Sequence, residues 1–187
     1  MATPDDAAAV RAIYAPFVET TAVTFESEVP AVAEMAERIR ATVPRFPWLV
    51  AERGGSVVGY AYASTWRSRA AYRWAVETTA YLRDDARGQG LGRALYRPLL
   101  ACLRLQGLRL ALAGITLPNA ASVGLHEAFG FRAVSVYRAC GHKLGAWHDV
   151  GMWELELAPR TDASPPEPLD VAAASTLPAW AAALLGS

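Results

Sequence analysis

The stretch Arg87-Gly88-Gln89-Gly90-Leu91-Gly92 lies between a predicted strand and a predicted helix, and its glycines are the strongest local signal in the sequence. Glycines let a backbone approach a ligand closely, and a helix start offers unpaired N–H groups and a positive dipole end to phosphate oxygens. The glycines at positions 88, 90 and 92 do not match the dinucleotide-binding pattern G-x-G-x-x-G, and no Gly-Lys-Ser/Thr of a P-loop follows. The alternative is a glycine-rich turn that only starts a helix.

Hydrophobic periodicity on both sides of this stretch predicts a mixture of helices and strands. Thr3-Pro4-Asp5-Asp6 is typical of a helix start, and Gly54-Gly55 between two β-rich runs indicates a hairpin. Because the strands are apolar on both faces, we expect an α/β fold in which helices cover the sheet. The expected helices span about 4–18, 32–43, 88–106 and 118–130, and the expected strands span 48–53, 56–63, 73–82, 108–116, 131–139 and 148–157.

The composition favours a globular domain without a nucleic-acid or membrane partner. The 187 residues are 53% hydrophobic, and 18 basic residues balance 18 acidic ones. A net charge of zero leaves no electrostatic footprint for nucleic acid or an anionic membrane. No apolar run approaches the roughly 20 residues of a membrane-spanning helix, and the first residues do not form a signal peptide. Cys102 and Cys140 cannot build a disulfide framework, and free thiols favour a cytoplasmic location.

The C-terminal region differs in composition from the rest of the chain. After Pro159 the sequence is rich in Pro, Ala, Ser and Asp. This bias predicts one domain over residues 1–158 and a disordered Pro/Ala-rich tail over residues 159–187. One or two helical turns could form over residues 177–185.

The glycine-rich stretch and several longer segments together resemble one enzyme family. R-G-x-G-x-G resembles the pyrophosphate loop of GNAT acetyltransferases, and the order of the elements is similar. The more specific resemblance is to the branch of phosphinothricin and methionine sulfoximine N-acetyltransferases, over roughly residues 5 to 157. The segments that carry it are Thr24–Glu26, Pro47–Glu52, Trp66–Tyr72, Val76–Thr79, Leu117–Asn119, Ser122–Glu127 and Gly141–Val150.

The resemblance implies a GNAT fold with a central twisted mixed sheet, and direct acetyl transfer from acetyl-CoA to the amine of a small amino-acid-like substrate. An acetyltransferase for another amine, including a protein N-terminus, and a non-catalytic CoA-binding sensor remain alternatives. The oligomeric state stays open, with a homodimer as one alternative to a monomer. The residues that the resemblance assigns to acetyl-CoA are Ala80, Tyr81, Leu82, Arg87, Gly88, Gln89, Gly90, Leu91, Gly92, Arg93 and Asn119.

Glu77 lies inside a mostly apolar predicted strand and is the first catalytic candidate. A buried carboxylate is costly unless it is paired, and burial raises its pKa toward the range of a general base. The alternative is a structural ion pair with Arg69 or Arg73. The resemblance implies that Glu77 takes the proton of the substrate ammonium, directly or through water.

His126 is the second catalytic candidate, and it shares one predicted helical face with Asn119 and Ser122. The alternative is a histidine, at the surface or in the core, whose hydrogen bonds are satisfied and which has no catalytic role. Many GNAT enzymes have a tyrosine at the matching position, which protonates the departing thiolate. The resemblance implicates His126 in catalysis and leaves its role open between acid, second base and substrate contact.

The substrate candidates lie in two loops. Arg67, Arg69 and Tyr72 could present planar donors and a hydroxyl to an anionic group, although a solvated loop is the alternative. The resemblance favours Arg69 and Tyr72 as substrate contacts, and it places Thr24 and Phe25 over the substrate pocket. We expect no metal, since the spacing of Cys140, His142, His148 and Asp149 fits no common zinc pattern.

The chain departs from the family in two respects, of which one is Pro98 inside the predicted helix over residues 88–106, where the missing N–H deletes the bond to the Ala94 carbonyl and should bend the helix. Family members usually have a strand before the first helix, whereas the first element predicted here is the helix that follows Thr3. Either the true start codon lies upstream or this first edge strand is missing, and we expect the strand over residues 48–53 to form an exposed edge of the sheet.

Overall fold

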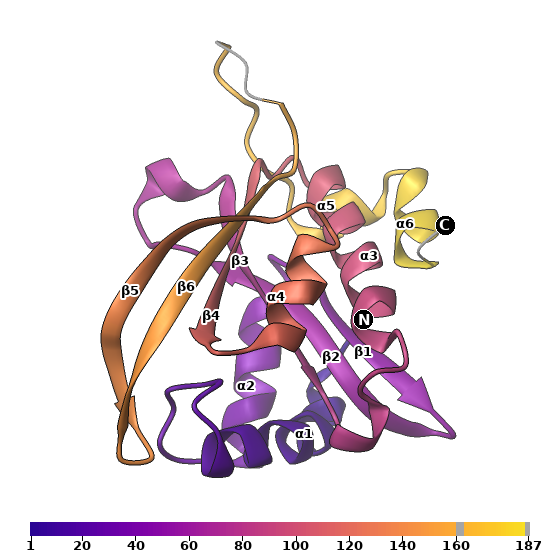
Figure 1. The fold of residues 1–187 in the computed structure, drawn as a ribbon. Coiled ribbons are helices and arrows are strands. Elements are labelled where there is room, and N and C mark those ends of the chain that lie inside the picture. The colour runs from indigo at the N-terminus through magenta and orange to yellow at the C-terminus, as the bar shows by residue number, and fades with distance from the viewer. Residues whose placement is uncertain (160–162, 186–187) are drawn as a thin grey trace.

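The computed structural model describes residues 1–159 and 163–185, which fold into one sheet with helices on both faces (Figure 1). Within the described residues the sheet has six strands in the order β1-β2-β3-β4-β6-β5. Neighbouring strands are antiparallel except for β3 and β4, which are parallel. The strands are β1 (Trp48–Arg53), β2 (Ser56–Thr65), β3 (Ala75–Leu82), β4 (Leu110–Leu117), β5 (Arg132–Lys143) and β6 (Ala146–Glu156).

The helices form two layers on the sheet. Helices α1 and α2 share one buried cluster with Trp48, Tyr60 and Tyr81. Helix α3 packs on the opposite face against Ala61, Val76 and their neighbours. The helices are α1 (Ala7–Thr20), α2 (Val32–Thr42), α3 (Leu91–Leu105), α4 (Ala120–Glu127), α5 (Val171–Ser175) and α6 (Ala179–Leu185), with short 3-10 helices η1 (Pro4–Asp6), η2 (Ala70–Tyr72) and η3 (Asp84–Ala86).

Alternation along the central strands explains why both faces are covered. Successive side chains of a strand point to opposite faces, so Tyr60 and Tyr81 face α1 while Ala61 and Val76 face α3. The tyrosine rings of Tyr60 and Tyr81 lie 5.5 Å apart, and Tyr14 of α1 meets Tyr81 edge-on at 5.0 Å. The face toward α1 and α2 is therefore rich in phenols, whereas the face toward α3 is aliphatic.

The final hairpin is longer than the sequence predicted. The structure continues β5 to Lys143 and starts β6 at Ala146, around a two-residue turn at Leu144 and Gly145. Both turn residues have positive φ, 51° and 78°, which matches the right-handed twist of the flanking strands. The register shifts between Tyr137, which pairs with Val150, and Gly141, which pairs with His148, and from there the pairing continues to the turn.

Strand β1 lies at one edge of the sheet, as the sequence predicted. The amide of Ala2 donates to the Trp48 carbonyl at 2.7 Å, so the first residues run beside the start of this edge. Strand β5 forms the other edge. No helix within residues 1–159 and 163–185 has the length and apolar character that a bilayer crossing requires.

The C-terminal region differs from the disordered tail predicted for residues 159–187. From Ala163 to Leu185 the chain runs back over the domain and forms α5 and α6, which lie beside α3 (Figure 1). Trp180 and Ala183 of α6 enclose Cys102 of α3 in a buried cluster. Composition pointed to disorder because alanine and proline dominate, but Trp180 is buried against α3, and Val171 and Leu184 pack against the same cluster. The domain therefore extends beyond residue 158.

This packing predicts that Trp180→Ala lowers the midpoint of thermal unfolding by roughly 6–20 °C. Trp180 is only 5% exposed. Truncation of a buried tryptophan lowers the free energy of unfolding by about 3–5 kcal/mol. For a chain of this size, each kcal/mol lowers the midpoint of thermal unfolding by about 2–4 °C. The control is Leu185→Ala in the same helix, because Leu185 is 82% exposed. Equal midpoints for wild type and Trp180→Ala, measured by circular dichroism, would contradict the packed segment.

Candidate active site

The parallel pairing of β3 with β4 ends after three residue pairs, and this opens the sheet. The pairs are Ala75 with Leu110, Val76 with Ala111 and Glu77 with Leu112. Beyond them, residues 78–82 of β3 pair with β2 alone, and residues 113–117 of β4 pair with β6 alone. We call the gap between these two segments the fork. Its two edges carry backbone polar groups that the sheet does not use.

The β3 edge of the fork presents the backbone of alternate residues. The Arg83 amide donates to the Val58 carbonyl at 2.9 Å, which fixes the hydrogen-bonded pairs between β3 and β2. By alternation, Tyr81 bonds to β2, and the backbone groups of Ala80 and Leu82 face the fork. Of the three β3 residues assigned to acetyl-CoA, Ala80 and Leu82 are thus available through their backbones, whereas Tyr81 is turned toward β2 and the core.

The β4 edge of the fork follows the same alternation. The Leu157 amide donates to the Arg109 carbonyl at 2.8 Å, so Ala111 and Ala113 pair with β6 while Leu112 and Gly114 face β3. The carbonyl of Leu112 accepts a hydrogen bond from the Thr78 hydroxyl at 3.2 Å. Side chains of β3 therefore satisfy the backbone of β4 where the ladder ends.

Glu77 lies at the base of the fork, at the last residue pair between β3 and β4. Burial raises the pKa of its carboxyl, and a hydrogen bond from the Gly114 backbone opposes that shift. A Cβ added at Gly114 would lie 3.3 Å from the Glu77 Oε1 atom, so a glycine lets the carboxylate sit directly against β4. Among the described residues no ion pair links Glu77 to Arg69 or Arg73, the pairing that the sequence had left open.

His126 is buried at 4% exposure, and both of its ring nitrogens have partners. Nδ1 lies 2.7 Å from the Ser122 carbonyl, and Nε2 lies 2.7 Å from the Tyr96 hydroxyl. Burial lowers the pKa of the imidazole, so the neutral ring donates from Nδ1 to the carbonyl and accepts at Nε2 from Tyr96. This is the hydrogen-bonded core histidine that the sequence kept as an alternative.

Glu77 and His126 approach the fork from opposite faces of the sheet. Glu77 shares its face with Tyr81 and hence with α1, whereas His126 packs edge-on against Tyr96 and Phe131 on the face of α3. The structure thus brings the two predicted catalytic residues to one region of the sheet without joining them.

The glycine-rich stretch forms an open loop before α3. Gly88 and Gly90 have φ of 72° and 79°, and a Cβ at either position would meet nothing within 4 Å. Gly90 is the N-cap residue and no side chain caps the helix, so the amides of Leu91, Gly92 and Arg93 lie at its first turn. The helix start therefore suits an anionic ligand.

The side chains of this loop hold its shape. Gln89 donates to the Asp85 carbonyl at 2.7 Å, and Arg87 pairs with Asp84 at 3.0 Å and lies over the Phe17 ring. Arg93 is exposed. A Cβ at Gly92 would lie 3.3 Å from a methyl of Leu125 and 3.8 Å from one of Leu82, which places this helix start against α4 and the end of β3.

Asn119 caps α4, the helix that carries His126. Its side-chain oxygen accepts from the Ser122 amide at 3.1 Å. Asn119 therefore fixes the start of α4, and the contact with acetyl-CoA expected of it remains a prediction.

Thr24 and Phe25 lie in the loop between α1 and α2, and the β5–β6 hairpin holds this loop. The Lys143 ammonium donates to the Thr24 carbonyl at 2.8 Å, and the Thr24 and Tyr14 hydroxyls are 2.6 Å apart. A Cβ at Gly141 would lie 2.2 Å from the Phe25 ring, so the ring rests on bare hairpin backbone. The two segments form one wall above the phenol-rich face.

Arg67, Arg69 and Tyr72 lie in the loop that joins β2 to β3. Arg67 lies over the rings of Trp66 and Tyr72, at 5.5 and 5.4 Å. Arg69 is exposed and precedes η2, where the Tyr72 amide donates to its carbonyl at 2.9 Å. Arg67 is thus engaged with the aromatic rings, whereas Arg69 presents its side chain to solvent.

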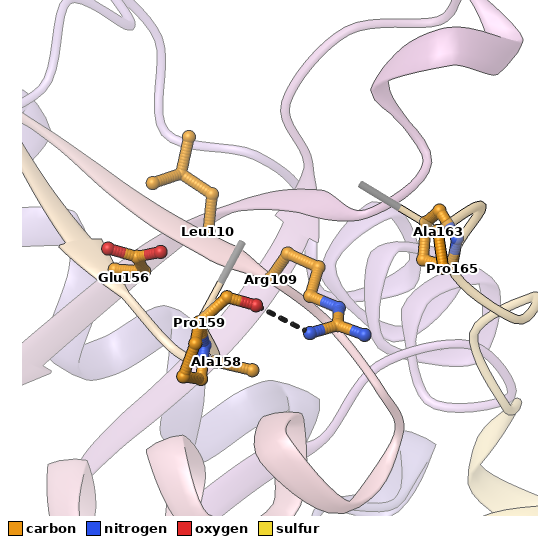
Figure 2. Close-up of a pocket in the computed structure, with 7 residues that line it drawn as sticks. All are labelled: Arg109, Leu110, Glu156, Ala158, Pro159, Ala163 and Pro165. Carbon is orange, nitrogen blue, oxygen red and sulfur yellow. Dashed lines mark hydrogen bonds between the residues drawn. The ribbon is translucent and has the colours of Figure 1, made fainter. Parts of the chain in front are cut away.

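The cavity drawn in Figure 2 does not mark this site. The cavity in Figure 2, of about 280 Å³, lies at the opposite end of β4 from the fork. It is lined by Arg109, Leu110, Glu156, Ala158, Pro159, Ala163 and Pro165, and none of them is a predicted site residue. The site lies at the fork instead, where the two strand segments do not pair with each other, an arrangement that suits an extended ligand. The described residues contain no group of three or more His, Cys, Asp or Glu side chains that could hold a metal ion.

Sequence reasoning missed several residues that shape the site. Gly114 contacts Glu77 from a strand about 35 residues away, and Tyr96 and Lys143 reach His126 and Thr24 from other elements. Gly114, inside a predicted strand, carried a usable signal, because such a glycine often marks the close approach of another group. Tyr96 and Lys143 carried none.

Comparisons with known proteins agree with this geometry. A profile described as an acetyltransferase (GNAT) domain matches residues 1–153. A phosphinothricin N-acetyltransferase of Streptomyces viridochromogenes is 44% identical over 155 residues, which cover 83% of this chain and 85% of the relative. An L-methionine sulfoximine/L-methionine sulfone acetyltransferase of Pseudomonas aeruginosa is 41% identical over 119 residues, or 63% of this chain and 69% of the relative.

A solved structure is similar over nearly the whole fold. It is a GNAT superfamily phosphinothricin acetyltransferase from Sinorhizobium meliloti in complex with AcCoA, with a TM-score of 0.85, 36% identity, and coverage of 89% of this chain and 91% of that one. The forked mixed sheet and the open glycine loop define an acyl-transfer domain. The chain belongs to the GNAT acetyltransferase family. The fold and the enzyme class predicted from the sequence are confirmed.

The buried His126 predicts a specific dependence of stability on pH. Its pKa is lowered in the folded state, so below about pH 6.5 the unfolded chain takes up a proton that the folded chain does not. The free energy of unfolding should therefore fall as pH drops from about 6.5 toward the lowered folded pKa. In His126→Gln this part of the fall should vanish, as measured by urea denaturation at a series of pH values.

The control for this experiment is His142→Gln, because His142 is an exposed histidine of the same chain. It should keep the wild-type slope. If wild type and His126→Gln lose stability in parallel between about pH 6.5 and 5, His126 does not titrate as a buried neutral ring.

Proposed function

We propose that this chain transfers the acetyl group of acetyl-CoA to the amine of a small amino-acid-like substrate such as phosphinothricin or methionine sulfoximine. The observation that carries this proposal is the Glu77 carboxyl at the base of the fork, which accepts a hydrogen bond from the Gly114 backbone and whose pKa is raised by burial. Relatives named for these two substrates align with most of the chain. Phenols lie on the same face of the sheet as Glu77, and this setting suits a small polar molecule.

The residues of the fork and the glycine loop fit acetyl-CoA. Open space and positive φ at Gly88 and Gly90 leave room for a pyrophosphate against the first turn of α3. The backbone groups of Ala80 and Leu82 could hold an extended arm along the fork. Bound there, acetyl-CoA supplies the acetyl thioester. In this arrangement the backbone amides of Leu91, Gly92 and Arg93, in the first turn of α3, would contact the phosphates.

The chain supplies a base and a polarising edge. Glu77 takes a proton from the substrate ammonium, directly or through water, which frees the amine to attack the thioester carbonyl. The new C–N bond replaces the C–S bond, and the thiolate of CoA leaves and takes up the proton that the amine nitrogen then loses. The amides of Ala80 and Leu82 point into the fork and polarise a carbonyl oxygen held there. Because protein dipoles in the sheet are fixed, they need no reorganisation when the charge develops.

In this proposal His126 has a positioning role and transfers no proton. Its Nδ1 proton is committed to the Ser122 carbonyl, and its Nε2 is occupied by the Tyr96 hydroxyl. A neutral ring with both nitrogens bonded inside the core is poorly placed to donate a proton or to serve as a second base. The pair of His126 and Tyr96 instead ties α4 to α3, whose first turn meets the phosphates.

Two loops recognise the substrate in this proposal. Arg69 and Tyr72 would bind an anionic or strongly polar oxygenated end, since a guanidinium offers planar paired donors. Thr24 and Phe25 would cover the amine side. Arg67 contributes mainly by stacking on Tyr72.

We also infer a homodimer in the cytoplasm. Edge strand β5 exposes Val134, Val136 and Tyr137, and two such edges can pair around a two-fold axis. Cys102 and Cys140 are free thiols, which fits a reducing compartment. Sedimentation equilibrium should give twice the chain mass, and Val136→Lys should give the monomer mass. A monomer mass for wild type at micromolar concentration would refute the pairing.

A panel of amines tests the proposed function. Thiol release from acetyl-CoA should be fastest with phosphinothricin, methionine sulfoximine or methionine sulfone, slower with plain amino acids and slowest with alkylamines. Arg69→Ala should raise KM for the polar substrates about tenfold or more, because a charge-assisted hydrogen bond contributes roughly 1.5–3 kcal/mol. Arg132→Ala is the control, since Arg132 is exposed on β5. Equal rates for every amine, or thiol release with none, would contradict the proposal.

Glu77→Gln tests the base. The change keeps the shape and removes the proton acceptor, so kcat should fall by about 10² to 10⁴ while acetyl-CoA affinity measured by calorimetry stays the same. The loss should shrink at high pH, because an α-amine with a pKa of roughly 8 is then already free. Wild-type kcat should fall on the acid side as the Glu77 carboxyl takes up its proton. Glu52→Gln, at the exposed end of β1, is the control.

The pH profile of His126→Gln discriminates between the two candidate bases. A positioning role predicts a loss of kcat that does not recover at high pH. Alkaline recovery in His126→Gln, together with only a modest defect in Glu77→Gln, would assign the base to His126 instead.

A further inference from the structure

The C-terminal segment Ala163–Leu185, here called the strap, lies outside the residues 1–153 that match the family profile. It crosses the end of the domain where β2 connects to β3 and then reaches α3 (Figure 1). Its contacts fall into two groups, one that anchors it and one that reaches the loop before β3.

The anchor of the strap is built on a buried glutamine. Gln106, 1% exposed, donates from its amide to the carbonyls of Arg45 and Leu169, both at 2.8 Å. The Leu169 amide returns a bond to the Gln106 carbonyl at 2.8 Å, and the Val171 amide donates to the Pro44 carbonyl at 3.1 Å. Helix α6 then packs on α3. The strap is therefore fixed independently of the loop that it touches.

The second group of contacts lies at the start of the strap. The Trp74 indole N–H donates to the Pro166 carbonyl at 2.8 Å, and the Arg73 guanidinium pairs with the Glu167 carboxylate. The same guanidinium donates from Nε to the Ala70 carbonyl of η2 at 2.7 Å. Arg73 thus links the strap directly to η2.

This link ends at the residues assigned to the substrate. Helix η2 is a single turn, closed by bonds from the Tyr72 amide to the Arg69 carbonyl at 2.9 Å and from the Arg73 amide to the Ala70 carbonyl at 3.1 Å. A single 3-10 turn has little stability of its own, so an outside contact has a large share in its order.

We propose that the strap positions the Trp66–Tyr72 loop for the amine substrate, with Glu167 as its positioning residue acting through Arg73. The inference rests on the proposed function, because that assigns Arg69 and Tyr72 to the substrate. An exposed ion pair adds little to global stability, so its loss should appear as local disorder of η2 and not as unfolding of the domain. A strap that only stabilises the fold would show the reverse pattern.

The test compares Glu167→Lys, Glu167→Gln and wild type. Lysine at 167 faces Arg73 with a like charge, whereas glutamine keeps an acceptor and removes the charge. The matched control is Glu37→Lys, because Glu37 is similarly exposed and pairs with Arg40 on α2, away from the loop. None of these substitutions changes a residue of the loop or of the fork.

The first measurement is hydrogen exchange of the apo protein. In Glu167→Lys the amides of Tyr72 and Arg73 should exchange roughly two- to fivefold faster, the size expected from loss of an exposed ion pair. Glu167→Gln should lie between Glu167→Lys and wild type, and Glu37→Lys should match wild type. Unchanged exchange in Glu167→Lys overturns the proposal without any reference to enzyme activity.

The second measurement is steady-state kinetics with the best amine of the panel. Glu167→Lys should raise KM for the amine about two- to fivefold, with kcat, KM for acetyl-CoA and the thermal midpoint unchanged. Faster exchange with an unchanged amine KM overturns the role in substrate recognition. If the wild type acetylates no amine, the proposed function fails, while faster exchange in Glu167→Lys still supports positioning of the loop by the strap.

Discussion

The short parallel pairing between β3 and β4 is the constraint on which this structure depends. Three residue pairs join the two halves of the sheet, and the strands then separate into the fork. A sheet cannot leave backbone amides and carbonyls unpaired without partners from elsewhere. At the base of the fork, Thr78 bonds to the Leu112 carbonyl and Glu77 accepts from the Gly114 backbone. The backbone groups farther along the fork have no strand partner, so the interruption of the sheet is also the edge at which we propose that the ligand binds.

Because side chains alternate along each strand, the two faces of the sheet differ in chemistry, and Glu77 and His126 lie on opposite faces. Glu77 lies among phenols on the side of α1, where the few oppositely charged neighbours allow burial to raise its pKa. His126 lies on the side of α3, where Tyr96 and Ser122 keep it neutral and fixed. The open start of α3 faces the end of β3 through the Gly92 contact with Leu82. The proposed proton acceptor, the proposed polarising edge and the proposed anion site therefore all lie at one fork and one helix start.

Segments far from the fork hold the loops around it. The β5–β6 hairpin fixes the Thr24 loop through Lys143 and through Phe25 on Gly141, while the strap contacts Arg73 beside η2. These contacts are single hydrogen bonds, ion pairs or ring contacts at the surface, which contribute little to global stability. They still determine which conformations the flexible loops populate, because such loops have few buried contacts of their own.

The sequence by itself determined the order of helices and strands, the glycine-started α3, the edge position of β1 and the acid inside β3, because periodicity, turn residues and a polar residue in an apolar run are local signals. It also carried the family, through segments such as Trp66–Tyr72 and Gly141–Val150. Only the tertiary structure decided that His126 is sealed by Tyr96, that Gly114 supports Glu77, that Arg69 is exposed while Arg67 is stacked, and that the Pro/Ala-rich C-terminus packs on α3. Each of these depends on residues that lie far apart in the chain and meet in space. Local composition and spacing carry no information about such partners.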